Sequence, residues 1–188
     1  MTASRLRLIV ILAGIIVAGL VVLTWTQPWF ELVLTTGATL SVPGQSAAPA
    51  LSALGLASLA LMGALSIAGR GIRIGLGALE AAIGVAVIVV AVGVITDPAA
   101  ASGSTITAAT AVSGPESIAA LIASATMSAF PVLAVVAGVL TTLVGAAVVL
   151  TGRRWPGPTK KYETAPSADT GTPVGAWDSL SDGTDPTR

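Results

Sequence analysis

Four long apolar runs dominate the chain, and shorter polar segments separate them. A helix needs about 20 apolar residues to cross the roughly 30 Å hydrocarbon core of a bilayer. Each run is about that long and is apolar on every face, whereas a helix half exposed to water carries one apolar stripe. The pattern predicts an all-α membrane protein with four transmembrane helices, over about residues 6–25, 50–69, 74–96 and 129–151.

The first apolar run also invites comparison with a cleaved signal peptide, because "MTASRLR" provides a charged start. Signal peptidase requires small residues just before the cleavage site. The run ends instead in "VVLTWTQPW", which places bulky groups there. The sequence therefore favours an uncleaved membrane anchor. Pro28 disfavours helical geometry at Gln27, so we expect this first span to end near residues 25–26.

The loop after the first span alternates apolar and polar residues in two short stretches. Phe30, Leu32 and Leu34 alternate with polar or smaller residues, a Thr-Gly turn signal follows, and Leu40 and Val42 resume the alternation. This period of two, interrupted by a turn, predicts a short extracytoplasmic β-hairpin. An isolated hairpin is marginally stable in water, so we expect it to lean on the membrane or on the other outer loop.

The loop before the fourth span contains "SGPESIAALIASAT" after a stretch rich in Ala, Ser, Thr and Gly. Ser113 or Gly114 can cap a helix, Pro115 suits its first turn, and Glu116 favours the positive end of its dipole. The apolar residues that would share one helical face are Ile118, Leu121, Ile122 and Ala125. This predicts a short amphipathic helix that rests in the outer interface or packs on the hairpin.

Charged residues are scarce, at 10% of the chain, and the basic ones are confined to alternate segments. All nine Lys and Arg residues fall at or before the start of the first span, between the second and third, or after the fourth. The loops at 25–49 and 96–129 contain none. Because basic residues stay on the cytoplasmic side, we expect a multi-pass protein of the plasma membrane with both termini in the cytoplasm.

The last segment of the chain changes character. Residues 156–188 are rich in Pro, Thr, Ser, Gly and Asp, and such a composition cannot bury enough apolar surface to order the chain. We expect a four-helix transmembrane domain over residues 1–155 and a disordered cytoplasmic tail over residues 156–188. Trp177 and Leu180 are either stray apolar residues of the tail or a short docking motif.

Three of the four tryptophans lie near the predicted ends of the spans. Trp25 lies at the end of the first span and Trp29 just after it. Trp155 follows the fourth span, directly after Arg153 and Arg154. Tryptophan is enriched at the boundary between lipid and water, where basic side chains also reach the headgroups. The five residues are therefore expected to be interface anchors.

The stretch "TWTQPWF" also supports a second interpretation. Trp25 and Trp29 offer stacking surfaces beside the amide of Gln27 and the carboxylate of Glu31. Such a set suits the recognition of an aromatic amino acid. The four residues are therefore a candidate ligand site, although their spacing does not demand one.

Glu80 is the one acidic residue well inside a predicted span. It follows Arg73 by seven residues, which corresponds to roughly 10 Å of helix. A charged group at that depth is costly, so Glu80 should face the bundle. Its role is either structural, through snorkelling or contact with Arg73 or another arginine, or functional, as a protonatable site coupled to solute movement.

Four pieces of the sequence together match a known pattern. They are "TWTQPWF", "TTGATLSVPGQSAAPALSALGLASLALMGAL", the "GRGIR" turn and "GRRWPGPTKKYE". These pieces, spread over about residues 5–163, resemble the tryptophan-biosynthesis-associated membrane proteins of actinobacteria. The resemblance implies four spans and a link to tryptophan metabolism, and it implies no catalytic residues.

The residue types restrict the chemistry further. Cysteine and histidine are absent, which excludes disulfides, thiolate or histidine catalysis, and zinc sites built from Cys or His. The spans also lack paired aspartates or a Ser–His pair, so we expect neither an enzyme nor a cofactor. The sequence favours an accessory or scaffold protein associated with tryptophan biosynthesis or handling. The alternative is a small proton-coupled exporter of tryptophan or a related aromatic metabolite that uses Glu80.

The expected partners follow from the same features. The apolar surface requires the lipid bilayer, and no nucleic-acid partner is expected. Small residues recur at helix-contact spacing, as in Ala134, Gly138, Thr142 and Ala146. They permit close packing within the bundle, with a second copy, or with another membrane protein.

Overall fold

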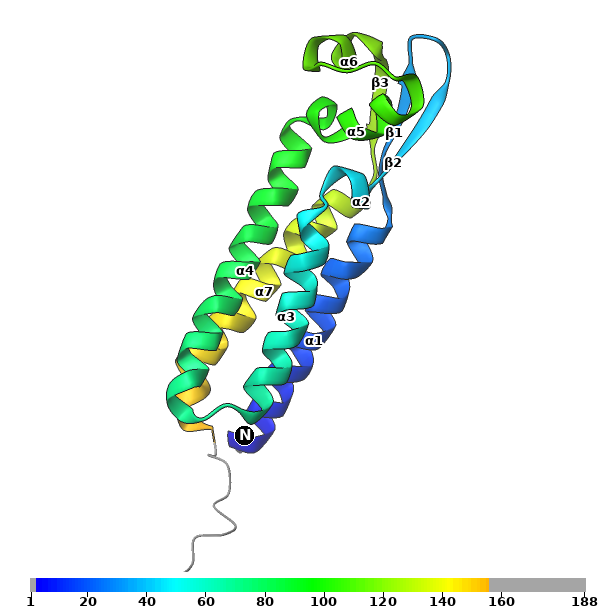
Figure 1. The fold of residues 1–188 in the computed structure, drawn as a ribbon. Helices are drawn as coiled ribbons and strands as arrows, with labels where there is room; N and C mark the ends of the chain where they lie inside the picture. Colours follow the sequence, from blue (N-terminus) through cyan, green and yellow to red (C-terminus); the bar gives the residue numbers. More distant parts are fainter. Residues whose placement is uncertain (1–2, 156–188) are drawn as a thin grey trace, which may run out of the picture. The chain divides into compact units, whose positions relative to one another are not determined.

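The structure, a computed structural model, describes residues 3–155 and contains the four predicted long helices. Each is long and apolar enough to cross a membrane. They run side by side as a bundle (Figure 1). The four helices are α1 (Ala3–Thr26), α3 (Ala50–Ile67), α4 (Arg70–Thr96) and α7 (Phe130–Thr151). The prediction of a mostly helical, four-span protein is therefore confirmed, and α1 ends next to Pro28 as expected. The predicted tail and Trp177 lie outside the described residues.

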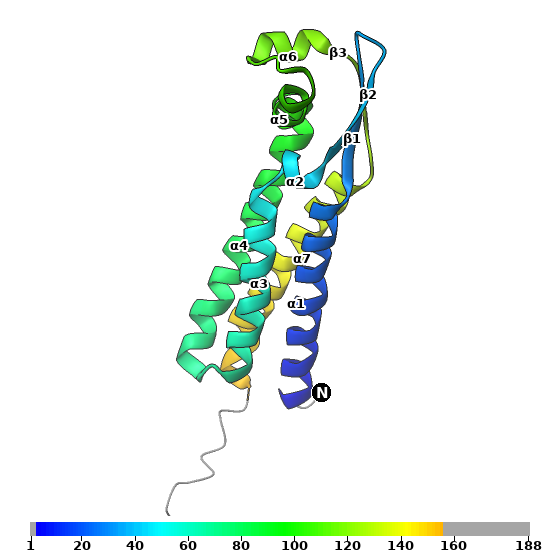
Figure 2. The ribbon, with the colours of Figure 1, turned by 45° about the vertical axis from the view of Figure 1, so that its right-hand side comes forward.

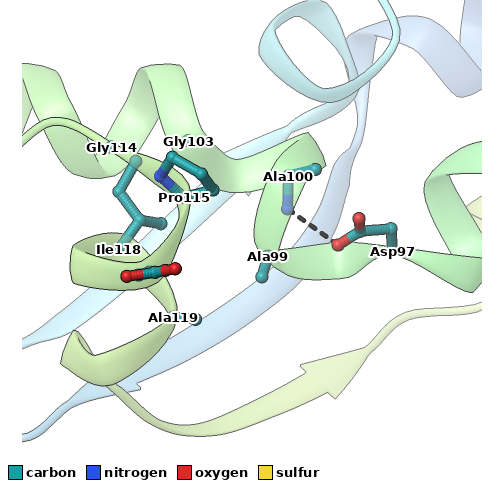
Figure 3. A pocket seen from close by; sticks show the side chains of 9 residues that line it. Asp97, Ala99, Ala100, Gly103, Gly114, Pro115, Ile118 and Ala119 are labelled. Atoms are coloured by element: carbon teal, nitrogen blue, oxygen red, sulfur yellow. Dashed lines mark hydrogen bonds between the residues drawn. The ribbon is translucent and has the colours of Figure 1, made fainter.

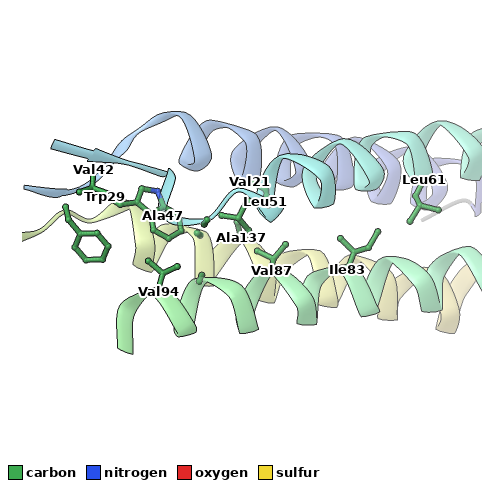
Figure 4. Packing of buried hydrophobic residues seen from close by; sticks show 14 of the residues in the cluster. Val21, Trp29, Val42, Ala47, Leu51, Leu61, Ile83, Val87, Val94 and Ala137 are labelled. Atoms are coloured by element: carbon green, nitrogen blue, oxygen red, sulfur yellow. The ribbon is translucent and has the colours of Figure 1, made fainter. Parts of the chain in front are cut away.

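The four helices are arranged as two pairs. Helix α1 contacts α3 and α7, while α4 packs along α7 and touches α3 less extensively. Figure 4 shows α1 and α3 on one side of the core and α4 and α7 on the other, with apolar side chains between the pairs. Leu51, Leu61, Ile83 and Val87 are among the buried residues of this core.

Helices α4 and α7 approach each other through glycines. A Cβ added at Gly84 would lie 2.4 Å from the Thr142 amide nitrogen, and one at Gly145 would lie 2.3 Å from the Ala81 nitrogen. A Cβ at Gly138 would in turn meet Ile88 at 2.7 Å. Small residues let helix backbones come close enough for strong van der Waals contact in lipid. The small-residue spacing around Gly138 thus serves packing inside the bundle.

Short elements form a separate layer at one end of the bundle, which we call the cap (residues 28–47 and 97–128; Figures 1 and 2). The other end holds the start of α1, the α3–α4 turn and the 3-10 turn η1 (Gly152–Arg154), and we call it the basic end. The cap elements are β1 (Pro28–Leu34), β2 (Thr39–Pro43), α2 (Gly44–Ala47), α5 (Pro98–Thr110), α6 (Pro115–Leu121) and β3 (Ile122–Met127).

The predicted hairpin is present as β1 and β2, which pair antiparallel. Gly37 has φ +83 in the turn between them, a backbone conformation that glycine adopts without steric cost. The sheet has a third strand, in the order β2-β1-β3. Ser128 secures this arrangement, because its Oγ donates to the Pro28 carbonyl at 2.8 Å and its amide donates to the Trp29 carbonyl.

The second outer loop corrects part of the sequence prediction. The amphipathic helix ends at Leu121, and Ile122 and Ala125 belong to strand β3 instead of its apolar face. Leu32 of β1 pairs with Ala125 in this strand. The physical reason is long-range, because the free edge of β1 offers backbone donors and acceptors that a hairpin alone leaves to water. Pairing with β3 satisfies them.

Helix α5 was not predicted, since its sequence "PAAASGSTITAAT" has no clear apolar stripe. Its start follows ordinary capping rules. Asp97 is the N-cap and its Oδ1 accepts from the Ala100 amide at 3.0 Å, and Pro98 occupies the first turn. Ile106 of α5 and Ile118 of α6 are buried in the cap. The burial of a few side chains in the tertiary structure thus supports a helix whose sequence shows no clear apolar stripe.

Candidate functional site

Glu80 and Ser58 form a buried polar pair between α4 and α3. Neither side chain is more than 1% exposed. The Ser58 hydroxyl donates to Glu80 Oε1 at 2.6 Å, and Glu80 Oε2 is buried without a hydrogen-bond partner in the described part of the chain. The expectation that Glu80 faces the bundle is met. An acidic group held inside a span by one hydroxyl is a candidate functional group, because buried intramembrane carboxyls commonly move protons or bind ions.

Contact with Arg73 was one of the structural alternatives for Glu80. The structure instead pairs Glu80 with Ser58 and Arg73 with Trp155. The guanidinium of Arg73 lies over the Trp155 ring, 5.7 Å from its centroid, and Nη1 donates to the Trp155 carbonyl at 3.2 Å. The reason is position along α4, because two helical turns separate Arg73 from Glu80. Arg73 lies in the first turn of α4 and so reaches the end of α7, where a cation–π contact is available.

Trp155 also differs from its predicted place at the lipid boundary. Its side chain is fully buried, and its Nε1 donates to Thr151 Oγ1 at 3.1 Å. Arg153 and Arg154 are exposed, as expected of residues at a membrane surface. Trp155 therefore packs inside the basic end of the bundle, where it connects the end of α7 to Arg73 of α4. Two motifs singled out in the sequence, the "GRGIR" turn and the "GRRWP" exit, are in contact here.

Trp29 is fully buried at the junction between the bundle and the cap. Its Nε1 donates to the Thr24 carbonyl at 2.7 Å, and a Cβ added at Gly44 would lie 2.6 Å from that nitrogen. A register shift between Pro28 and Phe30 lets Trp29 and Phe30 both point inward despite being neighbours. Trp29 therefore offers no surface for a ligand or for lipid, and only glycine fits at position 44 beside it.

The other residues of the candidate aromatic site are spread apart. Trp25 is partly exposed, with an Nε1 that is buried and has no hydrogen-bond partner among the described residues. Gln27 donates to Thr26 Oγ1 at 3.1 Å. Glu31 is exposed on the sheet face opposite Phe30, because successive strand residues point to opposite sides. The structure thus does not bring the four side chains into one pocket.

The cap contains a cleft that sequence reasoning missed. Its volume is about 520 Å³, and it lies between the first turns of α5 and α6. Figure 3 shows Asp97 and Ala100 across from Pro115 and Ile118. Asp97 and Glu116 supply carboxylates to a lining that is otherwise alanine, glycine, proline and isoleucine. The cleft was not predicted because one of its walls, α5, had no clear sequence signal.

The size of the cleft lies within the range of small-molecule sites, about 300–1,000 Å³. Its chemistry combines an apolar floor with negative charge, and Asp97 is already engaged as a helix cap. Within residues 3–155, no three acidic side chains gather in an arrangement that could hold a metal ion. The cleft is therefore a recessed surface in the cap, at the end of the bundle.

The comparisons with known proteins give one family. No curated protein and no solved structure matches this chain. Residues 7–187 match the family described as tryptophan-associated transmembrane protein. That match covers nearly the whole chain, and it agrees with the resemblance carried by the four sequence motifs. The four apolar helices are what a multi-pass member requires. The chain therefore belongs to the family of tryptophan-associated transmembrane proteins.

Proposed function

We propose that this protein is a non-enzymatic accessory protein of the plasma membrane that assists tryptophan biosynthesis or handling through its cap. The observation that carries this proposal is the contrast between the bundle and the cap. The bundle turns its polar groups inward and packs α4 on α7 through glycines. The cap instead exposes the carboxylates of Asp97 and Glu116 in a cleft of about 520 Å³. The cap is thus the part best suited to meet a partner or a solute.

The orientation is part of the same proposal, with the cap outside the cell and the basic end in the cytoplasm. Arg5, Arg7 and Arg73 lie at the basic end together with Arg153 and Arg154. The described cap residues include three acidic side chains and no Lys or Arg. Loops with basic residues stay in the cytoplasm, so this asymmetry supports an external cap.

Cysteine labelling tests the orientation, because the chain has no natural cysteine. Single cysteines at Ser113 in the cap and at Ser167 should report the two sides of the membrane. Ser113 is exposed, whereas Ser102 in the same loop is fully buried and would be a poor reporter. An impermeant thiol reagent should label position 113 in intact cells and position 167 after permeabilisation. Labelling of position 167 in sealed cells would reverse the proposed orientation.

Gene deletion followed by complementation tests the role of the cap. Deletion should change intracellular or exported tryptophan during starvation or excess, and the full chain should restore it. Ala119→Trp, which fills the cleft, should fail to restore it at normal abundance. Ala109→Trp is the matched control, since Ala109 is exposed on α5 and does not line the cleft. Restoration by both variants would show that the cleft is not used.

Proton-coupled transport is the second candidate. It is favoured by the Glu80 Oε2 atom, which has no hydrogen-bond partner within residues 3–155. A carboxyl with one hydrogen bond inside a span can exchange a proton without breaking an ion pair. Glu80→Gln keeps the shape and removes the charge. Transport requires that this variant lose proton-dependent tryptophan flux in vesicles at normal abundance. The accessory role requires that Glu80→Gln complement the deletion as well as the wild type does.

A further inference from the structure

A crevice at the basic end separates the first turns of α1 from the last turn of α3. Its volume is about 310 Å³, and its lining is Ser4, Arg7, Leu8, Ile11 and Ser66. The Arg7 Nη2 group donates to the Ser66 carbonyl, which holds the guanidinium across the gap between the two helices. A guanidinium has five N–H donors, so this bond leaves Arg7 able to bind a second acceptor in the crevice.

The depth of Arg7 is that of lipid phosphates. It precedes Trp25 by 18 residues on the same helix, a distance of about 27 Å along the axis. The hydrocarbon core is roughly 30 Å thick. When the end of α1 near Trp25 is at one boundary of the bilayer, Arg7 is therefore at the headgroup level of the other.

An apolar strip continues from the crevice into the membrane. Leu8, Leu12 and Ile15 are 58%, 49% and 42% exposed and follow one face of α1. Their spacing of three or four residues makes them neighbours on the helix surface. Apolar side chains in this position provide a track along which an acyl chain can lie, directly below the guanidinium.

We propose that this crevice binds the phosphate of an anionic phospholipid. Arg7 supplies a fork of donors that matches phosphate oxygens, and the strip from Leu8 to Ile15 receives one acyl chain. Arg5, exposed two residues earlier, adds a second positive charge that favours a lipid with net negative charge over a zwitterionic one. The proposal does not depend on the role of the cap.

Purified full-length protein in nanodiscs tests the site. Phosphatidylglycerol should raise the Tm more than phosphatidylcholine, and native mass spectrometry should detect retained phosphatidylglycerol. Arg7→Gln should weaken this retention by about tenfold, as expected for the loss of one charge-assisted contact. Arg154→Gln is the matched control, because Arg154 is exposed at the same end and does not line the crevice. It should retain the lipid like the wild type.

A second variant keeps the test decisive if Arg7→Gln does not fold. Ile11→Trp keeps every charge and fills the crevice, so it should lose the retained lipid as well. Equal losses in Arg7→Gln and Arg154→Gln would overturn the proposal, because general charge attraction would then explain binding. It would also be overturned if Ile11→Trp retained the lipid, or if inorganic phosphate raised the Tm as much as phosphatidylglycerol.

Discussion

Helix α4 has two interfaces that are built from opposite kinds of residue. Toward α7 it presents Gly77 and Gly84, and the two backbones come into close contact. Toward α3 it presents Glu80, which meets Ser58 in a single short hydrogen bond. In lipid there is no hydrophobic force between helices, so close backbone packing is the main source of attraction. The α4–α7 interface therefore supplies stability, and the α3–α4 interface supplies polar specificity.

The two interfaces of α4 also differ in how easily they can move. Glycine contacts tolerate little displacement, because the attraction falls steeply with a gap of less than 1 Å. The α3–α4 interface is smaller than the α4–α7 interface, and it joins the two helix pairs together with the contact between α1 and α7. If the bundle changes shape in function, the α1–α3 pair is expected to shift against the α4–α7 pair, with Ser58 and Glu80 at the boundary.

The largest expected effect is on the glycine interface. Gly84→Leu would force α4 away from the Thr142 backbone and should destabilise the protein by about 3 kcal/mol or more. Gly93→Leu on the same helix is the control, since a Cβ there has nothing within 4 Å. Unfolding in mixed detergent micelles measures both. Equal stability of the two variants would show that the close approach of α4 and α7 is not important.

A smaller loss of stability is expected when one partner of the hydrogen bond between α3 and α4 is removed. Ser58→Ala removes the hydroxyl that donates to Glu80 and should cost about 1–3 kcal/mol, because a buried acceptor is left without a donor. The double variant Ser58→Ala with Glu80→Leu replaces both partners by apolar groups and should recover most of that loss. Additive losses in this double-mutant cycle would mean that the two residues are not energetically coupled.

Glu80→Gln should have a milder effect than Ser58→Ala. The amide oxygen still accepts from Ser58, and the amide nitrogen takes the place of a carboxylate oxygen that has no described partner. The expected change is below about 1 kcal/mol, measured by the same unfolding assay. A loss larger than that of Ser58→Ala would show that Glu80 needs its charge for stability, and would weaken the view of it as a functional group.

The smallest expected effect is on the outer face of α4. A Cβ at Gly75 meets nothing within 4 Å, so Gly75→Ala removes backbone freedom without a clash. We expect a gain of about 0.5 kcal/mol from helix propensity. Gly84→Ala in the glycine interface should instead lose stability. A gain in both variants would contradict the close contact of α4 and α7.

Several features of the fold could be predicted from the sequence because they depend on neighbouring residues. The four spans follow from consecutive apolar side chains, and the end of α1 follows from Pro28. The hairpin follows from alternation around a Thr-Gly turn. The inward orientation of Glu80 follows from the cost of a carboxyl in lipid. Each conclusion needs only a local pattern and the properties of the solvent.

The partners of these elements were decided by the tertiary structure. Ser58 accompanies Glu80 because of how α3 and α4 are rotated about their axes, which four uniformly apolar helices do not encode in their pattern. Trp155 is buried at a place where Arg73, 82 residues earlier, lies over its ring. Strand β3 exists because β1 offers it an edge nearly 100 residues away. A local pattern determines which segments enter the membrane, but contacts between distant residues determine which side chains meet there.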